Sequence, residues 1–219
     1  MPTYSVYAPF NGSVTSLNCY CNVIGSPCSD PCATSGTKCK DIANCKTCSS
    51  PCGCSGCCYH TIVGPGYCCP LDIAAAQNTY IYAYMSTNIY SVKFVHMSDV
   101  CSTSCTPCQN DTIDLGTYLE LYTGLNATGF RVGYILYAHL KNRQKSNGQV
   151  VDCPNPGGSG HWGTLIGQIP PKPAYQQGCY SGPHTHFSVK TSSYSVSRNS
   201  NLGCASGVTA SSTLIYSWS

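Results

Sequence analysis

Cysteine is the residue type that most restricts how this chain can fold. The 219 residues include 19 cysteines, and thirteen of them fall within residues 19–69. This segment is rich in Ser, Gly and Pro and has almost no Leu, Phe or Trp, so burial of apolar side chains cannot order it. Cross-links must do so instead, and closing a loop of about 15 residues contributes about 3 kcal/mol in the chain-entropy model. The cysteines therefore predict a disulfide framework in a secreted, extracellular protein.

The cysteine-rich segment also contains two CxxC pairs, Cys45 with Cys48 and Cys54 with Cys57. This spacing occurs in zinc knuckles as well as in disulfide-rich domains. In a chain that we expect to be secreted, disulfides are the favoured interpretation. Because 19 is odd, at least one cysteine has no partner within the chain. A thiolate metal ligand, a free thiol or an intermolecular bridge would each satisfy that count.

Other sequence features agree with secretion. Sequons at Asn11, Asn110 and Asn126 predict glycosylation. The first residues lack the apolar stretch of a signal peptide, so we expect that any signal peptide has already been removed. No run of 18 apolar residues is present, which predicts no membrane span.

The scarcity of charged residues narrows the possible functions. Charged residues make up 9% of the chain, against about 25% in an ordinary globular domain, and the net charge is +3. This small excess does not predict a nucleic-acid partner, and we expect Lys141, Arg143 and Lys145 to lie in a solvated loop. Glu120 is the only glutamate. A glycosidase, which needs paired carboxylates, is therefore disfavoured.

From Asp72 onward the sequence consists of short alternating runs in which aromatic and β-branched residues dominate. Gly, Asn, Pro and Ser separate the runs, and no segment shows a capped helical stripe. We therefore expect an all-β fold, an antiparallel β-sandwich or open sheet, with the cysteine-rich segment as a loop-like insertion. The expected strands include residues 80–84, 90–95, 118–122, 131–140 and 184–189.

The sharpest local pattern is Gly182-Pro-His-Thr-His-Phe187. Residues two apart in a strand point to the same face, so His184 and His186 would project together. Two imidazoles on one face suit a metal site, or a metal ligand beside a general base. An isolated pair could equally be two half-exposed strand histidines, and His96 and His161 are expected to be ordinary surface or loop residues.

The order of motifs along the chain resembles that of the lysostaphin-like (LytM-type) zinc metallopeptidases, which cut bacterial cell-wall peptides. In that family a strand ending Tyr-x-His-Leu precedes a glycine-rich turn and then Gly-Pro-His-x-His-Phe. Here the corresponding segments are Tyr137-Ala-His-Leu140, Gly163-Thr-Leu-Ile-Gly167 and the motif at Gly182. Upstream, Pro70-Leu-Asp-Ile-Ala74 is similar to the family's His-x-Gly-x-Asp-Ile-Ala.

The resemblance covers roughly residues 70–190 and the first sixteen, where residues 9–16 look like the family's opening strand. It implies a peptidase-like β domain made of residues 1–18 and 70–219, interrupted by the insertion at 19–69. By position, Asp72 and His186 would bind Zn²⁺, and His139 and His184 would orient or deprotonate the metal-bound water. Zinc with three protein ligands and an open position lowers the pKa of bound water to about 7.

One position departs from the family pattern. The family's first ligand is a histidine four residues before the aspartate, where this chain has Cys68. Cys68 could be a thiolate ligand. It could instead be in a disulfide, with His60 completing the site, or the third ligand could be absent and the site a relic.

These features leave two functional hypotheses. The first is a secreted zinc endopeptidase that hydrolyses the cross-bridge or stem peptides of peptidoglycan. The second is a non-catalytic relative, an extracellular binding or structural protein that self-associates, which would suit the changed ligand and the seventeen tyrosines. Metal content separates them, because only the enzyme requires about one zinc per chain.

Overall fold

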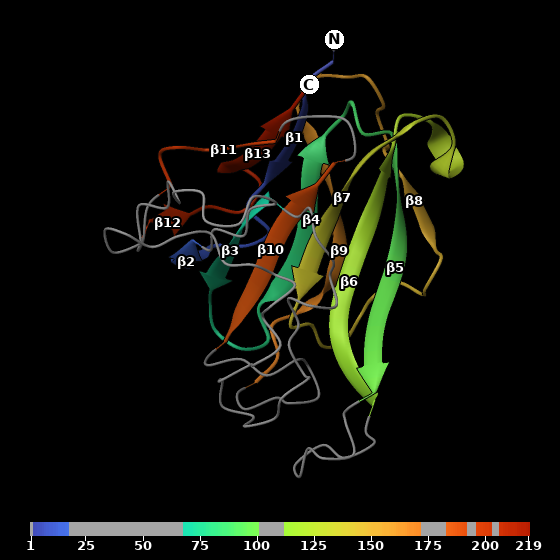
Figure 1. Ribbon diagram of the computed structural model, residues 1–219. Helices are drawn as coiled ribbons and strands as arrows, with labels where there is room; N and C mark the ends of the chain where they lie inside the picture. The colour runs from blue at the N-terminus through green and yellow to red at the C-terminus, as the bar shows by residue number, and fades with distance from the viewer. Residues whose placement is uncertain (1, 18–67, 101–111, 172–182, 192–195, 203–205) are drawn as a thin grey trace, which may run out of the picture.

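The chain folds into two antiparallel β-sheets (Figure 1). The computed structural model describes residues 2–17, 68–100, 112–171, 183–191, 196–202 and 206–219. The elements in chain order are β1 (Tyr4–Tyr7), β2 (Gly12–Leu17), β3 (Cys68–Ala74), β4 (Tyr80–Ser86), β5 (Ser91–Val100), β6 (Thr112–Tyr122), the short 3₁₀ helix η2 (Leu125–Ala127), β7 (Arg131–Ala138), β8 (Val150–Asp152), β9 (His161–Gln168), β10 (His184–Lys190), β11 (Ser197–Arg198), β12 (Gly207–Val208) and β13 (Leu214–Trp218).

One sheet has five strands in the order β11-β13-β1-β4-β9, and the other has eight in the order β12-β2-β3-β10-β7-β6-β5-β8. Figure 1 shows β4 and β9 behind β10 and β7. Segments far apart in the sequence pair here, since β13 joins β1 and β10 lies between β3 and β7. The first and last parts of the chain therefore help to build both sheets.

The core lies between the two sheets and follows from the period-two pattern. On β4, Ile81, Ala83 and Met85 are fully buried while the alternate tyrosines face outward. On β10, Phe187 and Val189 belong to the same apolar cluster as these β4 residues. Fully burying an aliphatic or aromatic side chain contributes about 1.5–3 kcal/mol. The expected antiparallel all-β sandwich is confirmed.

The strands extend the sequence-based expectations and correct them in places. Strands β4, β5, β6 and β10 contain nearly all of the corresponding expected runs, and β5 and β6 are longer than expected. Strand β7 ends at Ala138, two residues before the expected end. The segment 163–167, expected as a turn, lies inside β9. Strand β3 begins at Cys68 and so includes the last two residues of the expected insertion, of which residues 19–67 lie outside the described part.

Arg143 lies in the expected loop but is half-buried and not fully solvated. Its Nη2 donates hydrogen bonds to the carbonyl oxygens of Gly116 (2.9 Å) and Met97 (3.2 Å). Burial lowers the pKa of the Arg143 guanidinium to about 10. The side chain therefore ties this connection to β5 and β6, because a buried cation requires carbonyl or carboxylate partners.

The two histidines expected to be ordinary surface or loop residues both lie in strands. His96 is inside β5, and its backbone N–H donates to Asn147 Oδ1 (2.9 Å). His161 opens β9, is exposed, and packs its ring against those of Tyr7 and Tyr84. Among the described residues, no helix has the length and apolar character needed to cross a membrane.

Candidate functional site

Asp72 and the two histidines of the His-x-His motif meet on neighbouring strands. Asp72 of β3 is directly opposite His186 of β10 in the antiparallel register. Residues opposite each other point to the same face, so Asp72 Oδ1 lies 2.9 Å from His186 Nδ1 in a hydrogen bond. His184, two residues earlier on β10, brings its Nε2 to 3.8 Å from the same oxygen. The expected convergence of these three side chains is present.

His139 joins this group from the end of β7. It is buried, and its ring centroid lies 4.9 Å from that of His184 at an interplanar angle of 71°. Its backbone is left-handed, with φ at +57°, which is uncommon for a residue with a side chain. This conformation turns the chain out of the eight-stranded sheet, so that Lys141 exchanges two backbone hydrogen bonds of 2.9 Å with Gln168 of β9. The corner between the sheets therefore carries His139.

Two supporting residues were missed by the sequence analysis. The buried Thr185 hydroxyl donates to the carbonyl oxygen of Ala138 (3.2 Å), which links β10 to β7 between the histidines. Gly116 of β6 has φ at +109°, and a Cβ there would lie 2.1 Å from the Tyr137 carbonyl oxygen. In the sequence, Thr185 is recognisable as a polar residue between two histidines. Gly116 is recognisable as a glycine inside a strand-forming run, which indicates a close approach of two backbones.

The charge of Asp72 is maintained by the surrounding histidines. Burial raises the pKa of this carboxyl, but the hydrogen bond from His186 and the positive charges of His186, His184 and His139 outweigh that effect. The pKa of Asp72 therefore lies below its ordinary value. A carboxylate held ionised among imidazoles can accept hydrogen bonds or bind a cation.

The Asp72–His186 pair has donor atoms and spacing that fit zinc. Zinc binds carboxylate oxygen and imidazole nitrogen at about 2.0–2.2 Å, so two tetrahedral ligand atoms lie about 3.3 Å apart. The observed separation of 2.9 Å is about 0.4 Å shorter, and small side-chain rotations would open it. The described residues contain no group of three or more His, Cys, Asp or Glu side chains arranged to hold a metal ion.

The third ligand expected from the sequence is not among the described side chains. The backbone of Cys68 pairs with Val189, past a register shift between Phe187 and Val189. The Cys68 side chain and the whole of His60 lie outside the described part of the chain.

Cys153 accounts for the odd number of cysteines. Its thiol is free and buried, and burial raises its pKa although a backbone hydrogen bond at Asn155 partly opposes the shift. With Cys153 unpaired, 19 − 1 leaves 18 cysteines, an even number. The count therefore no longer requires a further unpaired thiol at Cys68.

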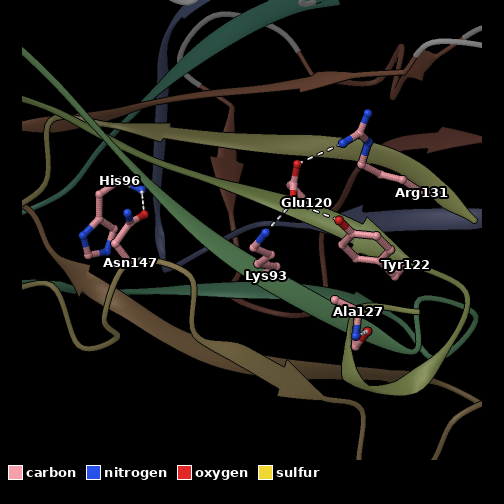
Figure 2. Close-up of polar contacts among 8 residues, drawn as sticks. Lys93, His96, Glu120, Tyr122, Ala127, Arg131 and Asn147 are labelled. Atoms are coloured by element: carbon pink, nitrogen blue, oxygen red, sulfur yellow. Dashed lines mark hydrogen bonds and ion pairs between the residues drawn. The ribbon is translucent and has the colours of Figure 1, made fainter. Parts of the chain in front are cut away.

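A second ionisable cluster, around Glu120, is a structural network (Figure 2). Glu120 accepts from Arg131 Nη1 at 3.0 Å and from the Tyr122 hydroxyl at 2.9 Å, and Lys93 Nζ lies 3.7 Å away. Figure 2 shows these side chains projecting from neighbouring strands toward the carboxylate. Both Glu120 oxygens are occupied by donors, which agrees with disfavouring a glycosidase.

Two of the three sequon asparagines lie in the described part of the chain. Asn126 lies exposed in η2, and Asn11 is exposed with its side-chain oxygen accepting from the Ala210 N–H (2.8 Å). Asn110 lies outside the described residues. Exposure is what glycosylation of Asn126 and Asn11 would require.

Comparison with known proteins gives no relative for this chain. No protein-family model, no curated protein and no solved structure matches it. The functional interpretation therefore depends on the side chains themselves and on the order of the motifs.

Proposed function

We propose that this protein is a secreted zinc-dependent endopeptidase that hydrolyses cross-bridge or stem peptides of peptidoglycan. The observation that carries the proposal is the meeting of Asp72, His184, His186 and His139, contributed by three adjacent strands. These are the positions to which the lysostaphin-like resemblance assigns two ligands and two water-orienting histidines. Their side chains lie within hydrogen-bond or ring contact of one another.

In this proposal Asp72 and His186 hold the ion, with the third ligand supplied by Cys68 or His60. When bound, zinc would acidify a water molecule and polarise the peptide carbonyl. His184 and His139 would act as a pair: one imidazole would accept a proton from water, and the other would stabilise the charge that develops on the carbonyl oxygen. Histidine suits both tasks because it titrates near neutral pH.

The substrate class follows from the family resemblance and from the expected extracellular location. Peptides with short side chains, such as glycine-rich or D-alanyl bridges, can lie extended against a sheet. Among the described residues, the site combines one carboxylate with three imidazoles.

The proposal predicts a division of roles between two histidines. His186→Ala removes a ligand and should lower zinc content from about one per chain to a small fraction of that, because the ion loses a direct bond. His139→Ala should keep zinc and lose hydrolysis of glycine-bridged peptidoglycan by about 10²–10⁴-fold, as expected for loss of general acid–base catalysis. Elemental analysis of protein purified without added metal, together with a peptidoglycan-release assay, measures both.

His161→Ala is the matched control, since this histidine is exposed on β9 of the other sheet. It should keep its zinc, because the proposal assigns this imidazole no role at the metal. Equal loss of zinc in the His139 and His186 variants would contradict the assigned roles. A chain without zinc and without hydrolysis would instead support the non-catalytic scaffold.

Alkylation of Cys68 identifies the third ligand. A thiolate ligand is protected from alkylation while zinc is bound and becomes reactive once a chelator removes the metal. In that case Cys68→His should keep the metal and raise activity, because it restores the His-x-x-x-Asp spacing. If chelation leaves the reactivity of Cys68 unchanged, the ligand is elsewhere, and His60→Ala should then reduce zinc content.

A further inference from the structure

The outward face of the five-stranded sheet carries a cluster of aromatic side chains away from the Asp–His site. Strand β4 presents three tyrosines at alternate positions, and Tyr7 of β1 and His161 of β9 flank them. Tyr7 is directly opposite Tyr84, and His161 is opposite Ser86. We define the tyrosine strip as Tyr7, Tyr80, Tyr82, Tyr84 and His161.

Four of the five rings of the strip form one connected layer. The Tyr82 and Tyr84 rings are stacked, with centroids 5.4 Å apart and an interplanar angle of 18°. His161 bridges the layer, since its ring lies 6.3 Å from that of Tyr84 and 5.0 Å from that of Tyr7. Tyr80 at one end is 53% exposed. The strip is therefore an ordered aromatic surface that water reaches.

A glycine makes room for the central ring. Gly163 of β9 is directly opposite Tyr84, and a Cβ at this position would lie 2.5 Å from Cδ1 and Cε1 of the Tyr84 ring. The φ of Gly163 is not in the left-handed region, so backbone conformation does not require a glycine here. The absent side chain instead lets the Tyr84 ring lie across β9, which continues the aromatic surface from one strand to the next.

The chemistry of this surface selects its partner. Strands β1, β4, β9 and β13, which are described in full, contain no Asp, Glu, Lys or Arg. Each tyrosine of the strip combines an apolar ring with a hydrogen-bonding hydroxyl, and His161 adds an imidazole. The described strands that carry the strip therefore offer no charged side chain to a charged partner, although Arg198 lies on the edge strand β11. Protein interfaces, in contrast, typically combine aromatic residues with arginine.

We propose that the tyrosine strip binds a neutral, β-linked polysaccharide. A pyranose ring has the matching character, because its C–H face stacks on an aromatic ring while its equatorial hydroxyls reach hydrogen-bonding groups at the edge. Tyr80 and Tyr84 are four residues apart along β4, or about 13 Å, which is longer than one sugar ring. The strip is thus a chain-binding surface that works independently of the Asp–His site.

The test is a calorimetric titration of the full chain with cellohexaose and with chitohexaose. The wild type should bind at least one of these neutral hexasaccharides. Tyr80→Ala and Tyr84→Ala should each weaken binding about tenfold, as expected for loss of one aromatic contact. Tyr84→Phe should retain most of the affinity because the ring remains. The matched control is Tyr118→Ala. Tyr118 is a half-exposed tyrosine of the eight-stranded sheet, and its ring contacts that of Tyr134 in the same sheet.

Several results would overturn the proposal. One is the absence of binding to both hexasaccharides, and another is an equal loss of affinity in the Tyr118 control. Dissociation of a dimer by Tyr80→Ala in sedimentation would identify the strip as a contact between two copies of the chain. Loss of sugar binding on treatment with a chelator would indicate that the sugar binds at the Asp–His site and not at the strip. Unchanged sugar binding after chelation, or in His186→Ala, supports the strip whether or not the chain is a peptidase.

Discussion

His139 is held in a conformation that its own side chain disfavours. Its φ of +57° lies in the left-handed region, where non-glycine residues occur mainly when the surrounding structure fixes them. Here the fixing contacts are the paired backbone hydrogen bonds of Lys141 with Gln168 on one side and the β7–β10 pairing on the other. The strain places the imidazole beside His184, and this is consistent with a functional position.

His96 should make the stability of the folded chain depend on pH. Burial lowers the pKa of His96, the positive charge of Arg143 lowers it further, and a backbone hydrogen bond to Lys145 partly opposes both effects. The folded state therefore binds fewer protons than the unfolded state between the lowered pKa and the ordinary value of about 6.5. The free energy of unfolding contributed by this residue is complete above about pH 6.5 and falls as the pH drops through the lowered value.

Urea unfolding of the wild type and of His96→Gln at two pH values, about 7.5 and about 5, checks this expectation. The midpoint of the variant should change less between the two conditions. The other buried groups titrate in both proteins, so the difference between them isolates His96. An equal pH dependence would show that His96 is protonated as easily when folded as when unfolded.

At the scale of single elements, β6 depends on a glycine. Gly116 has φ at +109°, and an added Cβ would lie 2.1 Å from the Tyr137 carbonyl oxygen and 2.8 Å from Ala138 Cα. Gly116→Ala should therefore lower the free energy of unfolding by about 2–4 kcal/mol through backbone strain and overpacking. It should also displace the end of β7, and with it the ring of His139.

Gly207→Ala is the control, because nothing lies within 4 Å of its added Cβ and its φ is not left-handed. The free energy of unfolding of this variant should stay within about 0.5 kcal/mol of the wild-type value. Chemical denaturation measures both variants, and NMR signals of the His139 ring report the displacement. A Gly116→Ala protein as stable as the wild type would show that β6 and β7 separate easily.

At the scale of the whole molecule, Tyr216 joins the two sheets directly beneath β10. Its ring centroid lies 5.5 Å from that of Phe187, and its hydroxyl donates to the Phe187 carbonyl oxygen at 3.3 Å. Tyr216→Phe should lower the free energy of unfolding by about 0.5–1.5 kcal/mol, since the hydrogen bond to the Phe187 carbonyl is lost. Tyr216→Ala should cost about 3–5 kcal/mol because it opens a cavity in the core.

Tyr80→Phe is the control for this pair, because Tyr80 is 53% exposed and its change should be nearly neutral. Thermal unfolding monitored by circular dichroism ranks the three variants. A Tyr216→Ala protein as stable as Tyr80→Phe would mean that the two sheets do not depend on this contact.

Features that depend on residues close together in the chain can be predicted from the amino-acid sequence. Alternation of apolar and polar residues predicted the strands, and the two-residue spacing of His184 and His186 predicted their common face, because both follow from the geometry of a single strand. The order of the motifs also indicated that Asp72 and His139 belong with them. These inferences needed no knowledge of the register.

Only the tertiary structure decided which strands pair and in what register. The expected turn at 163–167 became strand β9 because β4 supplies hydrogen-bond partners along its length. Arg143 is half-buried because the carbonyls of Gly116 and Met97 are brought to it. The tyrosine strip likewise exists only because β1, β4 and β9 are neighbours. Such contacts join residues that are far apart in the chain. The local sequence pattern therefore cannot predict them.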